Sequence, residues 1–407
     1  MRVALVVGGM PSRGTSGDSV VMRTVIERLR ALEHEVAVTV LLTPADIAES
    51  AAWIDEAESE LRALGVAVSR LTIELPPPDA DLAAAVFPEG SAVEAVQAAL
   101  AQSGPDVVVG FDTGILLALR GYLGAPVFGI PGDPRHLVWR YQVLGRPWRE
   151  RLSRAWVQEL LRYRRGAALI EETLVECARS CSAAGMFGAQ HAAWLRSLGV
   201  PCAYLPLPIR DRRPAGGVVR AQGTRLRILH LGGLGTTGTR LGCDLLVRVV
   251  LPRLERDLGP NGYALRIVGS GSLSPGLARR LARPGVEVVG FVDDTAAEIA
   301  GADVFLVPSP YPVGARTRIA EALSIGVAVV AHADAATGIP ELVDGDNALL
   351  AATGSGLAEA VLRLARDPEL RDRLAVAARA TYDRNFVPEI ACDVLVRELE
   401  RLAGQVR

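Results

Sequence analysis

The chain has 407 residues, of which 50% are apolar and 22% are charged, and its net charge is −2. This balance is typical of a globular protein of two domains, and it provides no overall positive field that would recruit nucleic acid. The sequence contains no lysine, so all 44 basic residues are arginines. Schiff-base chemistry and a P-loop lysine are therefore excluded.

The apolar run at residues 3–7 is too short for a signal peptide, and no apolar stretch reaches the length that spans a membrane. The five cysteines form no C-x-x-C pair. Buried, reduced thiols are expected, which fits a cytoplasmic protein. The abundance of alanine and arginine indicates a bacterial source of high GC content.

Strand and helix patterns alternate along the first half of the chain. Residues 2–9 form a β-branched run that ends in glycines, and residues 18–32 carry apolar side chains at helical spacing. Further strands are expected in residues 105–112, 125–130, 167–173 and 200–208. Strands that alternate with helices favour a parallel sheet covered on both faces.

Residues 205–217 interrupt this pattern with three prolines and a charge cluster, which is typical of a linker. Residues 225–235 then repeat the opening pattern of a strand that runs into glycines. Further strands are expected in residues 263–272, 286–291, 302–309 and 327–332. The chain is thus predicted to form two Rossmann-like α/β domains that face each other across a cleft. They comprise residues 1–208 and 209–387, and a final helix in residues 388–407 is expected to pack back on the first domain.

Residues 314–332, GARTRIAEALSIGVAVVAH, predict a helix over 315–325 followed by a strand. No Ser, Thr, Asp or Asn precedes the helix to cap its first N–H groups. Arg316 and Arg318 place positive charge near the positive end of the helix dipole. A bound phosphate would resolve both conflicts. The alternative without a ligand is a solvated helix face with an Arg318–Glu321 ion pair.

Residues 304–350, which contain this helix, resemble the signature region of family 4 glycosyltransferases. That family carries a proline-serine strand end, a Glu-x₇-Glu motif and an EA-A-G-PVVA segment, and Glu321 matches its second glutamate. The resemblance covers most of residues 225–385 and includes the segments IVGSGS and VEVVGFVDD. It implies the GT-B fold and transfer of a sugar from a nucleoside-diphosphate sugar with retention of anomeric configuration.

Three features depart from the family pattern. Val313 occupies the place of the first motif glutamate, and residues 232–242 lack the family's phosphate-binding arginine and lysine. No histidine occurs in residues 128–133, where the family has one beside the acceptor. The first two departures resemble a branch with a GGTR-K--EA signature, whose basic residues lie in the signature helix, as Arg316 and Arg318 do.

The resemblance implies a donor site around the start of the signature helix. Arg316 and Arg318 would stabilise the charge that grows on the leaving phosphate, and Glu321 would accept hydrogen bonds from ribose hydroxyls. The other residues expected to contact the donor are Gly17, Gly233, Arg240, Gly269, Gly271, Val292, Gly314 and Thr317. Neither a metal ion nor a further cofactor is expected.

Residues 129–142 are the candidate acceptor site. Asp133, Arg135 and His136 cluster after a predicted strand, where the family places acceptor contacts, and Asp133 is the candidate catalytic carboxylate. The alternative interpretation is a turn that Asp133 forms before Pro134.

Residues 146–165 predict a basic helix with one apolar stripe. The stripe consists of Trp148, Leu152, Trp156, Leu160 and Tyr163. Core packing is the usual role of such a stripe, and contact with an anionic membrane is the alternative.

These features predict a retaining glycosyltransferase that uses a nucleotide sugar and a small-molecule acceptor, such as a secondary metabolite. A lipid or glycan acceptor is the alternative to a small molecule. A sugar-nucleotide epimerase or phosphorylase on the same fold is a second interpretation. A protein that binds a nucleotide sugar without turnover is a third.

Overall fold

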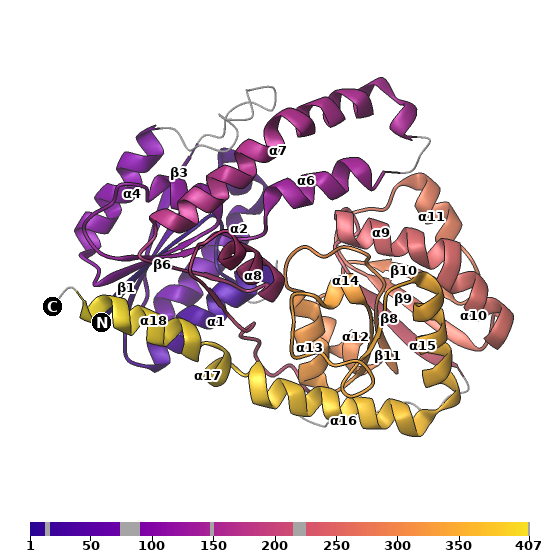
Figure 1. The fold of residues 1–407 in the computed structure, drawn as a ribbon. Helices are drawn as coiled ribbons and strands as arrows, with labels where there is room; N and C mark the ends of the chain where they lie inside the picture. The colour runs from indigo at the N-terminus through magenta and orange to yellow at the C-terminus, as the bar shows by residue number, and fades with distance from the viewer. Residues whose placement is uncertain (13–16, 74–89, 147–149, 215–224, 406–407) are drawn as a thin grey trace. The chain divides into compact units, whose positions relative to one another are not determined.

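The computed structural model describes the chain except residues 13–16, 74–89, 147–149, 215–224 and 406–407 (Figure 1). The chain divides into two compact units. Unit 1 consists of Met1–Pro208 and Ala391–Arg407, and unit 2 consists of Ile209–Ile390. Trp148, expected in the apolar stripe of the basic helix, lies outside the described residues.

The described part of unit 1 contains a seven-stranded sheet in the order β3-β2-β1-β4-β5-β6-β7. Its strands are β1 Arg2–Val7, β2 Glu35–Leu42, β3 Ala67–Thr72, β4 Val107–Phe111, β5 Val127–Ile130, β6 Ala183–Met186 and β7 Cys202–Tyr204. All neighbours are parallel, and Val3 pairs with Val36 on one side and with Val107 on the other. The order reverses between β1 and β4, where Rossmann-like sheets open a crevice for ligands.

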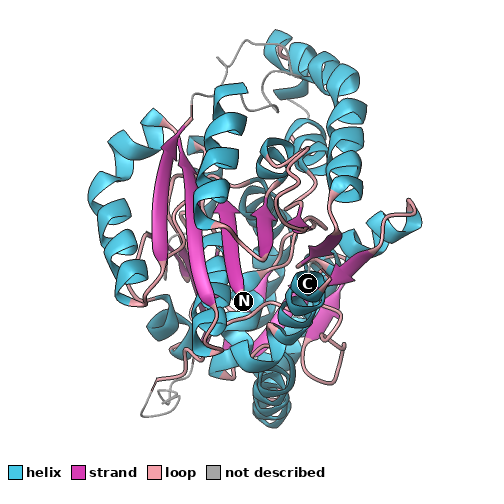
Figure 2. Ribbon diagram, turned by 90° about the vertical axis from the view of Figure 1, so that its left-hand side faces the viewer, coloured by secondary structure: helices cyan, strands magenta, loops and turns pink. Residues whose placement is uncertain are grey.

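Helices flank this sheet on both sides, as the alternation of strands and helices predicts (Figure 2). The described helices of unit 1 are α1 Gly17–Ala31, α2 Pro44–Ala63, α4 Gly90–Ser103, α5 Thr113–Ala118, α6 Arg135–Leu144, η1 Glu150–Leu152, α7 Arg154–Ser180, α8 Ala189–Ser197 and α18 Asp393–Gly404. Leu395, Leu399 and Leu402 bury one face of α18 in unit 1.

The prediction of a strand at residues 167–173 is wrong, because these residues lie within α7. The buried side chains Ile170, Leu174 and Cys177 recur at positions i, i+4 and i+7 of the helix. A short apolar run fits one face of a helix as well as a strand, and only the longer period distinguishes them. The strand of this region is β6, a run of four mostly small residues that the pattern did not reveal.

The described part of unit 2 contains a six-stranded parallel sheet in the order β10-β9-β8-β11-β12-β13. Its strands are β8 Leu226–Leu231, β9 Tyr263–Val268, β10 Val286–Gly290, β11 Val304–Val307, β12 Ala328–His332 and β13 Leu349–Ala351. Its helices are α9 Thr237–Leu245, η2 Leu246–Val250, α10 Leu251–Leu258, α11 Pro275–Leu281, α12 Thr295–Ala300, α13 Thr317–Ile325, α14 Ala333–Ala336, α15 Gly354–Arg366 and α16 Pro368–Asn385. The short helix α17 (Pro388–Ala391) follows in the chain. The order reverses here between β8 and β11, as in a second Rossmann-like sheet.

The start of the predicted linker is bound to α16. Ile209 donates from its backbone N–H to the Phe386 carbonyl at 3.0 Å, and the Tyr382 hydroxyl donates to the Ile209 carbonyl at 2.8 Å. Arg379 donates to both carboxylate oxygens of Asp211, each at 2.8 Å. Residues 209–213 are therefore part of the packed unit.

Two further observations concern the described part of the chain. None of its helices is long and apolar enough to cross a membrane. All five cysteines are unbridged, and four of them are buried.

Candidate functional site

Helix α13 begins without a side-chain cap, as the sequence predicts. Its N-cap residue is Arg316, and Gly326 ends the helix with a φ of 81°. Within the described residues, no oxygen accepts a hydrogen bond from the backbone N–H of Thr317 or Arg318. Two amide donors at the positive end of the helix dipole are therefore available to an anion.

The Arg316 side chain is held against Tyr311 at this helix start. Its guanidinium donates to the Tyr311 carbonyl at 2.9 Å and lies 5.1 Å from the centre of the Tyr311 ring. A Cβ atom at Gly238, in the first turn of α9, would lie 3.2 Å from the Tyr311 ring and 3.3 Å from the guanidinium. The starts of α9 and α13 therefore lie side by side, and a glycine leaves room for the arginine.

Glu321 lies one turn into α13 and is partly exposed. Burial raises the pKa of its carboxyl group, and the charges of Arg212 and Arg318 act against that shift. No residue in the described structure hydrogen-bonds to this carboxylate or forms an ion pair with it. The alternative of a surface Arg318–Glu321 ion pair is therefore not observed, and the carboxylate is available to a ligand that brings its own donors.

Ser324, three residues after Glu321 in α13, points into the core. It is fully buried, and its Oγ donates to the Glu321 carbonyl at 2.7 Å.

Two glycine-rich loops pack together at the carboxyl ends of β8 and β9. A Cβ atom at Gly269 would clash with the Gly232 carbonyl, and one at Gly271 would lie 3.3 Å from the Gly235 nitrogen. Gly269 and Gly271 also have positive φ angles of 154° and 87°. This close approach requires glycine at both positions. A Cβ atom at Gly233, in the same loop, would lie 3.0 Å from the methyl group of Thr236.

His230 occupies the point where β8 and β11 separate. Their ladder pairs Leu229 with Phe305, and at the next residue the His230 Nδ1 donates to the Leu306 carbonyl at 3.0 Å. The side chain is only 1% exposed, and burial lowers its pKa to about 4, with smaller contributions from the charges of Arg318 and Arg316. The ring is therefore neutral at pH 7, and its Nε2 has no hydrogen-bond partner among the described residues.

The remaining predicted donor residues fall at different places. Gly314 is buried, with a φ of 77°, just before α13, and Arg240 is partly exposed on the first turns of α9. Val292 is partly exposed two residues after β10. These three share the carboxyl edge of the unit 2 sheet with α13. Gly17 is the first residue of α1 and belongs to unit 1.

Asp112 is the notable residue at the crevice of unit 1. It directly follows β4 with a φ of 86°, a conformation that non-glycine residues rarely adopt. Its Oδ1 accepts from the Gly114 N–H at 2.9 Å and so caps α5. The predicted acceptor residue Arg135 lies 3.2 Å from the same carboxylate. Backbone strain of this kind is concentrated at functional sites.

The structure separates the other predicted acceptor residues. Asp133 is exposed in the turn before α6. His136 is buried, with its ring 5.5 Å from that of Trp194 and its Nε2 3.8 Å from the Glu171 carboxylate. Burial lowers the pKa of His136, and the Glu171 charge opposes the shift. Asp112 and Arg135 therefore form a cluster that His136 does not join.

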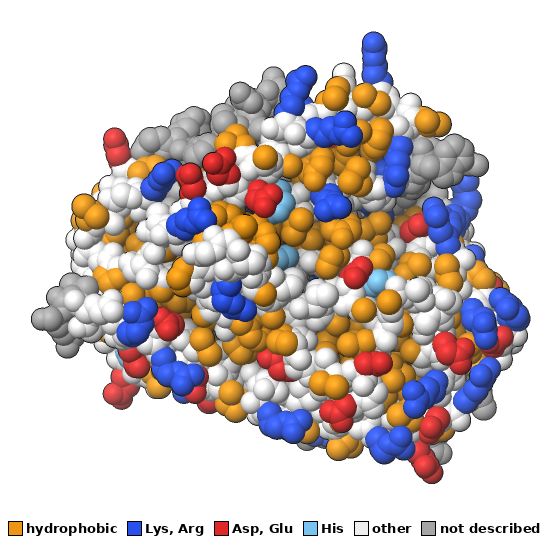
Figure 3. All heavy atoms as spheres, in the orientation of Figure 1, with side chains coloured by type: hydrophobic (Ala, Val, Ile, Leu, Met, Phe, Trp, Pro, Cys, Tyr) orange, Lys and Arg blue, Asp and Glu red, His pale blue; other side chains and the backbone are white. Residues whose placement is uncertain are grey.

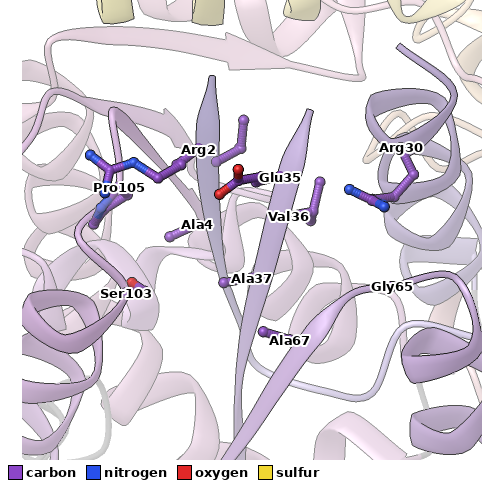
Figure 4. Close-up of a pocket in the computed structure, with 11 residues that line it drawn as sticks. Arg2, Ala4, Arg30, Glu35, Val36, Ala37, Gly65, Ala67, Ser103 and Pro105 are labelled. Carbon is purple, nitrogen blue, oxygen red and sulfur yellow. The ribbon is translucent and has the colours of Figure 1, made fainter. Parts of the chain in front are cut away.

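A cavity of about 290 Å³ lies at the opposite edge of the unit 1 sheet, near the amino ends of its strands (Figure 4). Arg2 and Arg30 flank it, but both already bind protein acceptors. Arg2 pairs with Asp106 at 3.2 Å, and Arg30 donates to the carbonyls of Leu64 and His34. Ligands of parallel α/β sheets bind at the other edge, so this cavity is not a candidate active site.

No three His, Cys, Asp or Glu side chains of the described residues gather closely enough to hold a metal ion.

Sequence reasoning did not identify four residues of these sites: Asp112, Arg212, His230 and Tyr311. Only Asp112 carried a usable signal, because it ends a buried strand where parallel sheets bind ligands. The others depend on contacts between distant segments.

Residues 225–367 match the family model described as glycosyl transferases group 1. This match lies within unit 2 and includes α9, α13 and both glycine-rich loops. No curated protein matches the sequence.

Several solved structures resemble the whole chain. Sucrose-phosphate synthase from Thermosynechococcus elongatus matches with a TM-score of 0.73 and 17% identity, and the match covers 100% of this chain and 100% of the synthase. HepE from Anabaena in complex with UDP has a TM-score of 0.67 and 14% identity, and the match covers 99% of this chain and 100% of HepE. A mutant TarM from S. aureus in complex with fondaparinux, alpha-GlcNAc-glycerol and UDP has a TM-score of 0.68 and 10% identity over 98% of this chain and 99% of its own. The predicted GT-B fold is confirmed, and the chain carries a glycosyltransferase domain on that fold.

Proposed function

We propose that this protein transfers a sugar from a nucleoside-diphosphate sugar to a small-molecule acceptor, with retention of configuration at the anomeric carbon. The observation that carries the proposal is the uncapped start of α13, flanked by Arg316 and Arg318, within the glycosyltransferase domain. A diphosphate would take the two available amide donors together with both guanidinium groups.

We use the name α13 site for the residues around the start of α13 that would bind the donor, and each has a role in this proposal. They are Gly233, Val292, Gly314, Arg316, Arg318 and Glu321. Arg316, already held by Tyr311, binds the diphosphate together with Arg318. The Glu321 carboxylate accepts hydrogen bonds from two ribose hydroxyls. The backbone at Gly233 and Gly314, where glycine adds no side chain of its own, would approach the phosphates closely. Val292, at the end of β10, lies beside the base.

Uracil is the first base to test. The solved complexes of HepE and TarM both contain UDP. Further HepE complexes contain UDP-glucose, or UDP together with glucose. These ligands were bound to HepE and TarM, and for that reason we would test UDP and UDP-glucose first with this protein.

The chemistry we propose uses no protein nucleophile. The leaving phosphate takes the proton of the attacking acceptor hydroxyl on the same face of the sugar, while Arg316 and Arg318 stabilise its growing charge. A preorganised donor of this kind typically contributes 10²–10³-fold to the rate. Val313, at the place of the family's first motif glutamate, is buried and apolar, so contact with the donor sugar must come from other groups.

The acceptor is assigned to unit 1. Asp112 and Arg135, joined at 3.2 Å, offer one hydrogen-bond acceptor and one donor at the crevice of the sheet, with Asp133 exposed nearby in the chain. Hydroxyl groups of a small molecule would bind to such a pair.

A thermal-shift screen against UDP, GDP, dTDP, ADP and NAD tests the donor site. A ligand at 100 times its dissociation constant adds about 2.7 kcal/mol to the stability of the folded state. One nucleoside diphosphate, and not NAD, should raise the melting temperature. Preference for NAD, or no response to any ligand, would contradict the proposal.

Product analysis then separates the alternative functions. A transferase releases the nucleoside diphosphate from its sugar, slowly to water and faster once an acceptor is present. An epimerase converts the nucleotide sugar without releasing the diphosphate in stoichiometric amount. A binding protein gives the thermal shift with neither product.

A further inference from the structure

Helices α6 and α7 of unit 1 form a hairpin whose contacting faces are locked together (Figure 1). The Trp156 indole N–H donates to the Val143 carbonyl at 2.8 Å, and the Trp139 indole N–H donates to Glu159 at 2.6 Å. The rings of Trp139 and Tyr163 meet edge to face, with centroids 5.4 Å apart. The predicted stripe residues Trp156 and Tyr163 are thus packing residues, and the rotation of α7 about its axis is fixed.

The opposite face of α7 is exposed and partly apolar. Val157, Leu161 and Leu169 are 45%, 46% and 41% exposed. Arg154 and Arg165 lie on the same side of the helix, since residues three, four and eight apart share a face. Leu152, predicted to belong to the inward stripe, is instead 77% exposed just before α7. We call the exposed side chains of Leu152, Arg154, Val157, Leu161, Arg164, Arg165 and Leu169 the α7 face.

This part of the chain is strongly basic. Residues 140–169 contain eight arginines and two glutamates, whereas the whole chain has a net charge of −2. One of those glutamates, Glu159, accepts the Trp139 hydrogen bond on the inner side of the hairpin. Among the described residues, none pairs with the guanidinium groups of Arg162, Arg164 or Arg165. The charges of these three arginines are therefore not neutralised by any described residue of unit 1.

We propose that the α7 face docks this protein on the surface of an anionic lipid bilayer. Leucine and valine side chains would enter the acyl boundary, while the arginines between them would reach lipid phosphates. Figure 3 shows orange apolar atoms interspersed with blue arginines where Figure 1 draws α6 and α7.

Charge pattern and shape favour a bilayer over a protein partner. Protein interfaces are enriched in aromatic side chains as well as arginine, and their energy centres on well-packed aromatic anchors. The exposed apolar side chains of the α7 face are all aliphatic and have arginines between them, and the face follows a single helix. A fluid surface of anionic headgroups accommodates both features. The inference uses no residue of the α13 site, so it stands or falls separately from the proposed function.

Vesicle co-sedimentation tests the proposal with the full chain. The protein is mixed with vesicles of phosphatidylcholine alone or of phosphatidylcholine with phosphatidylglycerol. Binding is expected only to the anionic vesicles, and added salt should reduce it. Binding of equal strength to both kinds of vesicle, or to neither, would overturn the proposal.

Two variants separate the charged and apolar contributions. Arg164→Gln with Arg165→Gln should lower the partition coefficient by about fivefold for each arginine removed. Val157→Ser with Leu161→Ser should also weaken binding several-fold. The matched control is Arg373→Gln with Val376→Ser on α16 of unit 2, where both side chains are exposed, and it should bind as the wild type does.

Two further measurements guard the interpretation. All changed residues are exposed, so the variants should keep the melting temperature and any shift caused by a nucleoside diphosphate. Light scattering after gel filtration detects self-association. If the wild type is a dimer that Leu161→Ser dissociates, and vesicle binding is unchanged, a second copy and not a bilayer covers the α7 face.

Discussion

The Arg316 guanidinium donates to the carbonyl oxygen of Tyr311 at 2.9 Å and lies 5.1 Å from the centre of the Tyr311 ring. This double contact orders a long side chain before a ligand arrives, so less rotamer entropy is lost on binding. A charged group placed at the uncapped end of α13 is therefore preorganised for an anion.

Arg316→Ala is expected to weaken nucleoside-diphosphate binding by about 1.5–3 kcal/mol, the contribution of a charge-assisted hydrogen bond. Isothermal titration calorimetry measures the change. Arg316 caps no helix N–H through its side chain, so the melting temperature without ligand should fall only slightly, through the lost contacts with Tyr311. Arg373→Ala, an exposed arginine of α16, is the control. An unchanged dissociation constant in Arg316→Ala would remove this residue from the site.

Glu321→Ala separates the nucleoside from the phosphates. Because this carboxylate is assigned to the ribose hydroxyls, the variant should lose about 1.5–3 kcal/mol of affinity for the nucleoside diphosphate. Its affinity for pyrophosphate should change little. Competition titrations with both ligands provide the comparison, and equal losses on the two would refute the ribose role.

Burial of two histidines predicts a loss of stability in mild acid. Burial lowers the pKa of His191 and of His230 to about 4, whereas the unfolded chain has a histidine pKa of about 6.5. The unfolded state therefore binds more protons between these values. The free energy of unfolding is greatest above about pH 6.5 and falls as the pH drops toward 4, by up to about 3 kcal/mol per histidine.

Urea unfolding across this pH range checks the prediction. His230→Asn keeps an N–H donor for the Leu306 carbonyl but cannot take up a proton. Its pH dependence should be shallower than that of the wild type by up to one proton. Identical slopes would show that His230 does not titrate on unfolding.

The pair of Asp211 and Arg379 predicts a second pH effect. Hydrogen bonds from Arg379 hold the pKa of the Asp211 carboxyl below its usual value. The stabilisation is complete above the unfolded value of about 4 and is lost as the pH falls through the lower folded value. Since Asp211 is half exposed, Asp211→Asn should cost only about 0.5–1 kcal/mol at pH 7.

A double-mutant cycle with Asp211→Ala and Arg379→Ala isolates this interaction. The coupling energy should vanish in strong acid. A coupling that persists after Asp211 is protonated would mean that packing, and not charge, links the residues.

Asp112→Gly separates strain from function in unit 1. Glycine adopts the φ of 86° without strain and costs only a few tenths of a kcal/mol as an N-cap. The stability should therefore stay within about 1 kcal/mol of the wild type. Transfer activity should fall because Arg135 loses its carboxylate partner. Asp112→Ala serves as the contrast, because alanine bears the backbone strain without the carboxylate and should destabilise the fold. Unchanged activity in both variants would exclude Asp112 from the site.

The sequence alone determined the features that depend on neighbours within a few residues. Alternating strands and helices, each half beginning with a strand and glycines, were enough to predict two Rossmann-like sheets. The missing cap before α13, the arginines at its start and the glycine at its end could also be predicted, because capping involves groups within one helical turn. The prediction of a strand at residues 167–173 was wrong because it also used only local sequence. A seven-residue window does not distinguish one face of a helix from a strand.

Only the tertiary structure decided which distant groups meet. The His230 ring reaches the Leu306 carbonyl across 76 positions, and Asp211 meets Arg379 across 168. The tertiary structure also showed that the neighbouring residues Arg135 and His136 have different surroundings. Arg135 pairs with Asp112, whereas the His136 side chain is buried. Local propensity sets the helix that holds both residues. Which partner each side chain contacts depends on how segments that are distant in the sequence pack against this helix.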